Sequence, residues 1–312
     1  MIRRRGLLAA SLLSPFILAA CKTSRSNIND SHIAKELADL EKISGGRLGV
    51  GIWDSATGRL SGHRLSDRFG MWSTYKRPLA AMILREIETG KLPGEQWVPY
   101  GEADMLSYAP VTRKNLAKGG MTVLALAEAT QKTSDNPAAN LLLKLIGGPQ
   151  GVTRRLRSLG DGVTRLDRDE PMMNLVLPGD ERDTTTPAAM AQTVARFFTD
   201  EMIPALNGEY LTVFGRETLK NWTIDTKTGL KRLRAGLPPD WIVGDKTGTG
   251  LAPAIHNMAN MHNDVAICWP PGRSQPIVIA AYYQADAHYD KMRPRDDAVL
   301  AKVGQIVARA MT

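Results

Sequence analysis

The 312-residue sequence has few cysteines, few aromatic side chains and no long uninterrupted apolar run. Its two cysteines, Cys21 and Cys268, cannot supply the disulfide framework of a small secreted scaffold. Aromatic residues make up 6% of the chain and are not interleaved with basic residues, as they are in nucleic-acid-binding surfaces. The apolar stretch at residues 7–20 is interrupted by Pro15 and is shorter than the roughly 20 residues that span a membrane.

Neither sign of charge dominates the chain. The formal net charge is +8, but three of the 40 basic residues are Arg3, Arg4 and Arg5, which leaves 37 against 32 acidic residues. This excess is spread along the sequence without a further block of lysine or arginine, which argues against nucleic acid as a partner. An apolar fraction of 43% is typical of a globular protein with a sizeable core, in one large domain or two closely joined ones.

Residues 1–20 have the pattern of a signal peptide, with a basic start, an apolar stretch and small residues at its end. Leu-Ala-Ala-Cys at 18–21 is similar to a bacterial lipobox, in which the cysteine is lipidated and becomes the first residue of the mature protein. The pattern predicts export to the periplasm, a lipid anchor to the membrane at Cys21 and a polar tether over residues 21–30. Cleavage nearby without lipidation is the alternative, and the three arginines leave twin-arginine export open.

The apolar periodicity places strands at both ends of the sequence and helices between them. A helical stripe over residues 33–43 ends at Gly45-Gly46, and two short strands joined by a tight turn follow it. Helical patterns dominate from residue 73 to about residue 230. Three further strands and a closing amphipathic helix are expected at 240–248, 263–271, 276–286 and 296–312.

This order predicts an α/β (α+β) fold of two parts, in which an antiparallel sheet covered by the terminal helices stands beside an all-α part. The folded region is expected over residues 31–312. Its sheet part would comprise 31–66 and 225–312, and its all-α part 67–224. A cleft between two such parts is a natural ligand site. Cys268 lies in an apolar strand, where a buried structural thiol is expected.

Three short motifs place reactive side chains in the helical block and on the strand after it. Ser73 and Lys76 are three residues apart and so share one face of a helix, where an amine can activate a serine hydroxyl as a nucleophile. Ser134-Asp135-Asn136 has the composition of a helix cap, which is its most ordinary interpretation in isolation. Lys246-Thr247-Gly248 offers a cation beside an open stretch of backbone. Each motif alone is a weak signal.

Together and in this order, the motifs resemble those of the class A serine β-lactamases. Fifty-seven residues lie between Lys76 and Ser134, and 111 between Ser134 and Lys246. The resemblance runs from about residue 45 to the C-terminus and includes "SYAPVT" at 107–112 and "RLDRDEP" at 165–171. Class C relatives carry Tyr-x-Asn and class D relatives Ser-x-Val in place of Ser-Asp-Asn, which favours class A.

The resemblance implies a hydrolase that opens the lactam ring of penicillin- and cephalosporin-type antibiotics without a metal or other cofactor. Ser73 would be the nucleophile and Lys76 its proton-transfer partner, while Ser134 would protonate the departing nitrogen. Glu170 would activate the water that breaks down the acyl-enzyme, and either Lys76 or Glu170 would take the Ser73 proton. The expected substrate-binding residues are Asn136, Asn174, Lys246, Thr247, Gly248, Thr249, Arg232 and Tyr108. Backbone N–H groups of Ser73 and Thr249 would form the oxyanion hole.

The charge run before Glu170 has a structural interpretation. Arg165 with Asp167, and Arg168 with Asp183, are expected to form ion pairs that brace an Ω-type loop. Partly buried pairs of this kind are destabilising to break singly, by a few kcal/mol. Asn174 lies one helical turn beyond Glu170, so the two side chains would hold the same water.

Two departures from the family pattern bear on substrate range. The hairpin segment 249–262 is longer than is usual in the family and carries His256 and His262, but no cysteine or acidic cluster stands near them in sequence, so no zinc site is expected. Trp72 and Gly250 occupy the positions at which serine carbapenemases of this class carry a disulfide, which weighs against carbapenem hydrolysis.

Two other functions share part of this pattern. A penicillin-binding transpeptidase or carboxypeptidase, or a non-enzymatic sensor of cell-wall damage, would be acylated at Ser73 without turning over. Glu170 favours the hydrolase, because turnover needs a second base beside the acyl-enzyme. The sequence indicates no obligate interface, and a monomer is expected.

Overall fold

The computed structural model describes residues 20–201, 203, 206, 208–251 and 258–311, with side chains from Asp30 onward. The helices are α1 (Ala20–Ser44), α2 (Lys76–Glu88), α3 (Val123–Thr133), α4 (Asn136–Leu145), α5 (Gly148–Ser158), α6 (Pro187–Arg196), α7 (Val213–Ile224), α8 (Leu233–Gly236) and α9 (Pro294–Met311). The strands are β1 (Arg47–Asp54), β2 (Arg59–His63), β3 (Phe69–Gly70), β4 (Trp97–Pro99), β5 (Gly120–Thr122), β6 (Thr184–Thr185), β7 (Ile242–Gly250), β8 (Met261–Trp269) and β9 (Ile277–Gln284). Short 3₁₀ helices lie at Trp72–Tyr75, Glu102–Asp104, Arg113–Lys118 and Met172–Asn174.

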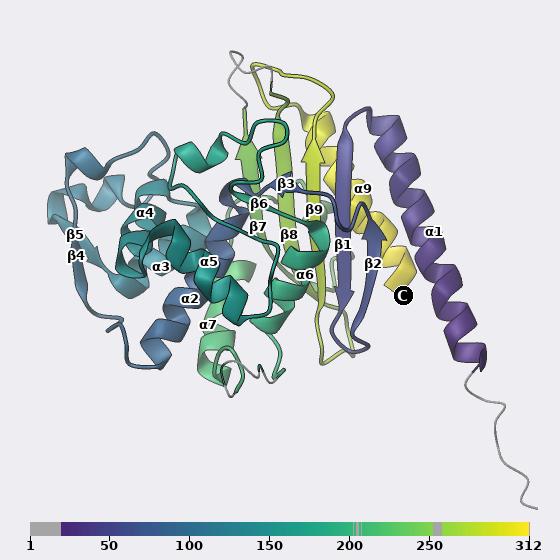
Figure 1. Ribbon diagram of the computed structural model, residues 1–312, viewed down its shortest axis with the longest axis horizontal. Helices are drawn as coiled ribbons and strands as arrows, with labels where there is room; N and C mark the ends of the chain where they lie inside the picture. The colour runs from purple at the N-terminus through teal and green to yellow at the C-terminus, as the bar shows by residue number, and fades with distance from the viewer. Residues whose placement is uncertain (1–19, 202, 204–205, 207, 252–257, 312) are drawn as a thin grey trace, which may run out of the picture.

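The main sheet is built from both ends of the chain. Its five antiparallel strands lie in the order β2-β1-β9-β8-β7, so that β1 pairs with β9 along its whole length (Figure 1). Strands β8 and β9 are buried on both faces, and β9 accordingly has a nearly continuous apolar sequence, whereas β8 is apolar only after its buried polar residues 262–264. Strand β7, which carries the Lys246-Thr247-Gly248 motif, is an edge strand beside the 3₁₀ helix Trp72–Tyr75.

One face of the sheet is covered by the two terminal helices together with α8. The predicted stripe of α1, with Ile33 and Leu37, packs with Leu300 and Val303 of α9 in one apolar cluster on this face. Cys268 of β8 belongs to the same cluster and is fully buried, and burial raises the pKa of its thiol. The prediction of a buried cysteine within a strand is therefore confirmed.

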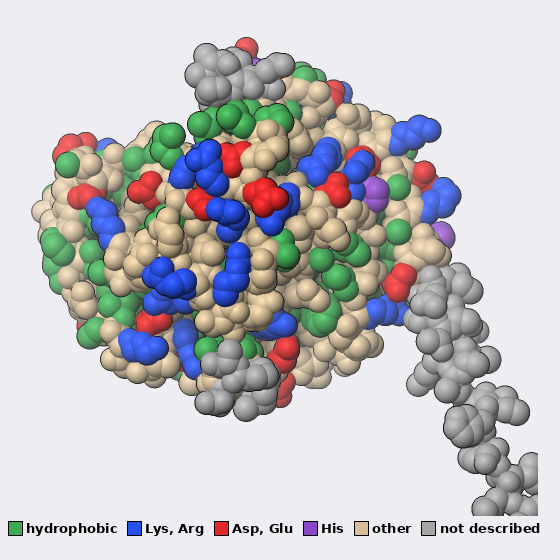
Figure 2. All heavy atoms as spheres, in the orientation of Figure 1, with side chains coloured by type: hydrophobic (Ala, Val, Ile, Leu, Met, Phe, Trp, Pro, Cys, Tyr) green, Lys and Arg blue, Asp and Glu red, His purple; other side chains and the backbone are tan. Residues whose placement is uncertain are grey.

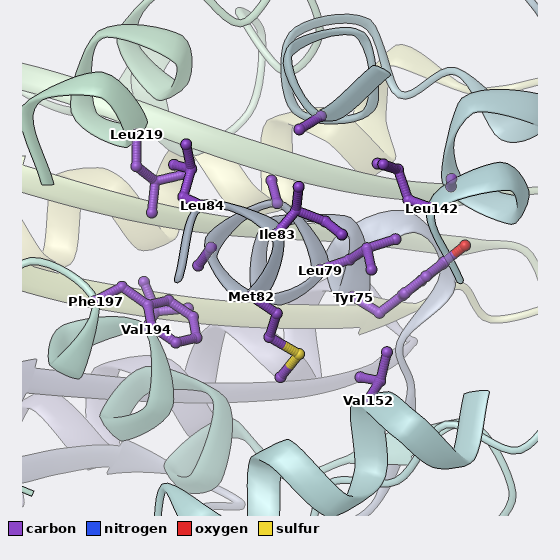
Figure 3. Packing of buried hydrophobic residues seen from close by; sticks show 14 of the residues in the cluster. Tyr75, Leu79, Met82, Ile83, Leu84, Leu142, Val152, Val194, Phe197 and Leu219 are labelled. Atoms are coloured by element: carbon purple, nitrogen blue, oxygen red, sulfur yellow. The ribbon is translucent and has the colours of Figure 1, made fainter. Parts of the chain in front are cut away.

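The other face packs against α6 and the helical block around α2. In Figure 3, Leu79, Met82 and Ile83 project from α2 in different directions, with Leu142 of α4 and Leu219 of α7 among the side chains around them. The same apolar cluster continues onto strands β8 and β9. The middle of helix α2, residues 78–84, is therefore apolar and buried all round because it lies at the centre of a core shared by both parts of the fold.

The predicted fold class is confirmed, with three local differences. The segment expected to be helical also contains the pairs β3–β6 and β4–β5, whose strands of two or three residues are too short to give a period-2 pattern. Helix α6 lies within the segment 67–224 yet packs directly on β1 and β9. Residues 21–30, expected as a tether, continue α1, and their role as a tether stays a prediction.

The surface mixes charges of both signs. Figure 2 shows basic and acidic side chains interspersed over the face seen in Figure 1. Most of the predicted signal peptide, residues 1–19, lies outside the described residues. Among the helices that are described, none is both long enough and apolar enough to cross a membrane.

We expect Leu79→Ala to lower the free energy of unfolding by about 2–5 kcal/mol, because it removes a fully buried side chain from the centre of the core. Urea denaturation followed by circular dichroism measures this change. Ile43→Ala is the matched control at a side chain that is 78% exposed, and it should change stability by less than about 0.5 kcal/mol. Equal losses in the two variants would contradict the central position of α2.

Candidate active site

A cleft of about 840 Å³ lies between the helical block and the edge strand β7. Nine of the predicted site residues line it: Ser73, Tyr108, Ser134, Asn136, Glu170, Asn174, Arg232, Thr247 and Thr249. Tyr108 is half exposed at its rim. Three more, Lys76, Lys246 and Gly248, form its back wall, where they contact the lining residues.

Lys76 is the hub of the site. Ser73 lies in the 3₁₀ helix that runs directly into α2, so that the Nζ atom of Lys76 donates to Ser73 Oγ at 3.0 Å. The same ammonium group donates to Asn136 Oδ1 at 2.5 Å and lies 2.9 Å from Glu170 Oε1. The Lys76 and Glu170 side chains are both fully buried. The lysine therefore joins a partly exposed serine hydroxyl in the cleft to a buried carboxylate.

In the Ser-Asp-Asn motif, the middle residue has a structural role and the two outer residues line the cleft. Asp135 caps α4 by accepting from the backbone N–H of Ala138 and also binds Thr112. The cap interpretation is thus correct for this middle residue. Ser134 ends α3 in the left-handed region, at φ 61°, while its Oγ atom accepts from Lys246 Nζ at 3.0 Å.

Lys246 lies behind the cleft rather than on its surface. Its ammonium group is fully buried and donates to Ser134 Oγ and to the backbone oxygen of Thr247. Burial lowers the pKa of Lys246 well below its ordinary value, and the nearby charge of Lys76 lowers it further. Of the three residues of this motif, Thr247 is the one that lines the cleft.

Gly248 is required by close packing. A Cβ atom at this position would lie 2.7 Å from the backbone oxygen of Met71 and 3.2 Å from the backbone nitrogen of Ser73. The absent side chain lets the backbone of the edge strand β7 lie close to the backbone of Ser73. Gly250 is equally constrained, because a Cβ atom there would overlap the ring of Trp72.

Glu170 is held from two directions. Asn174 donates from Nδ2 to Glu170 Oε2 at 2.7 Å, one turn along the chain as the sequence predicts. Asn140 of α4 binds the Glu170 backbone twice, donating to its oxygen at 2.8 Å and accepting from its N–H at 3.0 Å. The Glu170–Pro171 peptide bond is cis. Sequence analysis missed Asn140, because its partner lies 30 residues away and no local motif connects them.

The predicted braces of this loop are present. Arg165 pairs with Asp167 at 2.6 Å, and Arg168 pairs with Asp183 at 2.5 Å. Asp183 also accepts from the backbone N–H groups of Asp167 and Arg168. Its side chain is fully buried, and burial raises its pKa despite these donors. The charge run is thus the internal scaffold of a loop and not a solvated face.

Arg232 is the residue directly before α8, and its side chain lines the cleft. It donates from Nε to Asp297 Oδ1 at 2.8 Å, and from Nη1 to the backbone oxygens of Gly248 and Asn263. Its Nη2 atom donates to Thr249 Oγ1 at 2.7 Å. Asp297, which sequence analysis missed, comes from α9 and lines the same cleft.

No group of three or more histidine, cysteine, aspartate or glutamate side chains within the described part of the chain is arranged to hold a metal ion. His256 lies outside the described residues. His262 is described and is fully buried beside Asp296 and Asp297.

These contacts bring Ser73 together with a buried lysine and a buried glutamate in one cleft, which is the arrangement expected of a serine hydrolase. A model of the β-lactamase enzyme family matches residues 32–311 of the chain. The chain is 45% identical to β-lactamase L2 of Stenotrophomonas maltophilia over 99% of both proteins. It is 41% identical to β-lactamase AST-1 of Nocardia asteroides, over 99% of this chain and 96% of that relative.

Solved structures give the same result. The class A β-lactamase of the last common ancestor of Gram-negative bacteria is 48% identical, with a TM-score of 0.81 over 90% of this chain and 99% of that one. A β-lactamase from Xanthomonas campestris is 42% identical, with a TM-score of 0.82 over 91% of this chain and 99% of that one. The chain belongs to the class A β-lactamases. It is a hydrolase that acts on the cyclic amide of β-lactams.

Two buried carboxylates beneath the site give a testable pH dependence. Burial raises the pKa of Asp264 to about 8, and the charge of Asp245 adds to this shift. In the unfolded chain Asp264 would ionise near its ordinary value of 3.8. The folded protein therefore holds one more proton between these values, so this group stabilises the fold at acid pH and loses that contribution as the pH rises towards 8.

We expect Asp264→Asn to remove this dependence, since an amide can still accept from the backbone N–H of Leu233. From pH 5 to 7.5, the free energy of unfolding of the unchanged protein should fall relative to the variant by about 1 kcal/mol per pH unit. Urea denaturation at several pH values measures the difference. A difference that stays constant with pH would show that Asp264 is already ionised in the folded protein.

Proposed function

We propose that this β-lactamase hydrolyses penicillin- and cephalosporin-type rings through an acyl-enzyme at Ser73, which is broken down by water activated by Glu170. The observation that carries the proposal is the position of Lys76 Nζ, 3.0 Å from Ser73 Oγ and 2.9 Å from Glu170 Oε1. Lys76 therefore contacts both the proposed nucleophile, Ser73, and the other candidate base, Glu170.

In the first step, Ser73 Oγ attacks the lactam carbonyl carbon and gives up its proton. Lys76 Nζ is within hydrogen-bonding distance of this oxygen and can receive the proton once it has passed one of its own to Glu170, which is in contact with it. The net result is a protonated Glu170 and an unchanged Lys76. Negative charge then develops on the carbonyl oxygen. The backbone N–H groups of Ser73 and Thr249 would stabilise it, each by about 3 kcal/mol.

The ring opens when the bond between the carbonyl carbon and the lactam nitrogen breaks. Ser134 Oγ would donate a proton to that nitrogen and recover one from its neighbours, because Lys246 Nζ lies 3.0 Å away and Lys76 Nζ 3.4 Å away. The lowered pKa of Lys246 suits it to such a transfer.

Substrate contacts follow from the lining of the cleft. The carboxylate that accompanies the lactam ring would bind between Thr247, Thr249 and Arg232, with the side chain of Lys246 behind them. Asn136 accepts from Lys76 through Oδ1, which leaves its Nδ2 group to donate to the side-chain amide of the substrate. Tyr108 would form the rim beside that side chain.

Deacylation needs a water molecule held by a base. Glu170 and Asn174 face the cleft together and are joined by a 2.7 Å hydrogen bond, so they can hold one water between them. Glu170 would take a proton from this water as it attacks the ester, which releases the ring-opened acid and restores Ser73. A transpeptidase or a sensor does not need a base and an amide that hold a hydrolytic water at the acyl-enzyme. The presence of this pair therefore favours hydrolysis.

We expect Glu170→Ala to be acylated at Ser73 and then to retain the adduct. Loss of a general base slows the step that it serves by about 10²–10⁴-fold. Intact mass spectrometry after mixing with benzylpenicillin should show an increase of one whole substrate, because ring opening releases no fragment. Nitrocefin hydrolysis measures the accompanying loss of turnover.

Glu181→Ala is the matched control, because it removes an acid of the same loop whose side chain is 60% exposed. It should turn over at the rate of the unchanged protein and show no lasting adduct. If Glu170→Ala also turns over at that rate, the role given to Glu170 is wrong. If the unchanged protein itself keeps the adduct, the chain acts as a penicillin-binding protein or sensor.

We further propose export to the periplasm and a lipid anchor at Cys21, on the strength of the lipobox-like sequence. In cells, Cys21→Ser should move the protein from the membrane fraction to the soluble periplasmic fraction, since the acyl chains would no longer be attached. Immunoblotting of the two fractions measures this. Cys268→Ser is the control at a buried cysteine, and unchanged membrane association of Cys21→Ser would count against lipidation.

A further inference from the structure

His262 is a buried histidine next to the substrate cleft that the reaction steps above do not use. It lies in β8, directly across from Thr249 of β7. Its side chain is fully buried, and its ring faces two carboxylates at the start of α9. Tyr283 of β9 packs beside the same ring. A polar ring in such a position needs hydrogen-bonding partners.

The ring is connected to the cleft through a single oxygen atom. His262 Nδ1 lies 3.1 Å from Asp297 Oδ1, and this same oxygen accepts from Arg232 Nε at 2.8 Å. On its other side, His262 Nε2 lies 3.5 Å from Asp296 Oδ2. Arg293 fixes Asp296 through two hydrogen bonds of 2.7 and 2.8 Å. The ring thus contacts Asp297, the carboxylate that binds Arg232, and on its other side faces the fixed carboxylate of Asp296 without a hydrogen bond.

Arg232 has one N–H group to spare for a ligand. A guanidinium group has five N–H donors. The contacts within the described part of the chain use four of them: one to Asp297, one each to the backbone oxygens of Gly248 and Asn263, and one to Thr249. The fifth is on Nη2, beside Thr249 in the lining of the cleft. Nη2 lies on the same edge of the guanidinium as the Nε–H group, so the direction of this fifth N–H depends on how Asp297 holds Nε.

We propose that His262 is a positioning residue, which donates to Asp297 and so fixes the carboxylate that aims Arg232 at the carboxylate of the substrate. The inference rests on the proposed function. The side chain of Asp297 is 23% exposed, so without His262 this carboxylate can rotate towards water and release Arg232. Sharing the carboxylate between two donors also leaves Arg232 less neutralised, and therefore more attractive to an anionic ligand.

The titration of Asp297 agrees with this arrangement. Burial alone would raise the pKa of Asp297, but the hydrogen bond from His262 and the charge and hydrogen bond of Arg232 hold it below its ordinary value. Asp297 is therefore an anion with two donors on one oxygen. The further charged groups around the ring are Asp296, Arg293 and Arg295, all next to the start of α9 or within it.

The test compares benzylpenicillin with its methyl ester, which lacks the negative charge that Arg232 would bind. We expect His262→Leu, which keeps the bulk and loses the donor, to lower the preference in kcat/KM for the acid over the ester about tenfold. The change should lie mainly in KM. His262→Asn keeps an N–H donor near the position of Nδ1 and should stay within about twofold of the unchanged protein.

Each result decides between roles. If His262→Leu slows both substrates equally, the residue is only structural and the inference is overturned. Should His262→Leu fail to fold, Asp297→Asn takes its place, and an unchanged preference for the acid in that variant overturns the inference as well. Failure of the unchanged protein to hydrolyse benzylpenicillin at all would instead overturn the proposed function, from which the inference starts.

Discussion

The active site is organised around the burial of one charge. An ammonium ion removed from water is tolerated only where acceptors and an opposite charge surround it. For Lys76 these partners are Ser73 in the 3₁₀ helix before α2, Ser134 and Asn136 at the junction of α3 and α4, and Glu170 in the loop before α6. Satisfying this one group therefore brings three distant segments of the chain to the same point.

The loop that carries Glu170 meets this requirement by burying charges of its own. Asp183 is enclosed with Arg168 and two backbone N–H groups, which fixes the path of the loop on one side. Asn140 fixes it on the other side through both polar groups of the Glu170 backbone. A carboxylate held in this way keeps its position beside Lys76 without depending on the ligand, which is the preorganisation that catalysis by electrostatics requires.

Some contacts of the site could be predicted because they are short in sequence or follow the period of a helix, whereas residues far apart, such as Ser134 and Lys246, were placed together only through the resemblance to a known family. Ser73 and Lys76 share a helical face, and Arg165 reaches Asp167 two residues on. The contacts that escaped prediction join residues far apart without a motif, as Arg232 joins Asp297 over 65 positions. The short strands of the helical block could not be predicted for another reason: a segment of two or three residues is too short to show a periodic pattern.

The sequence by itself determined the chemistry of this protein: which side chains are present, in what order, and which neighbours they meet within one helical turn. Tertiary structure decided which of these groups lose contact with water. Lys246 carries an ordinary lysine side chain in the sequence, and its lowered pKa arises only when β7 is buried beside Lys76. His262 becomes a partner of Asp297 only when β8 packs against α9. Burial and long-range charge depend on packing, and packing is a property of the whole chain.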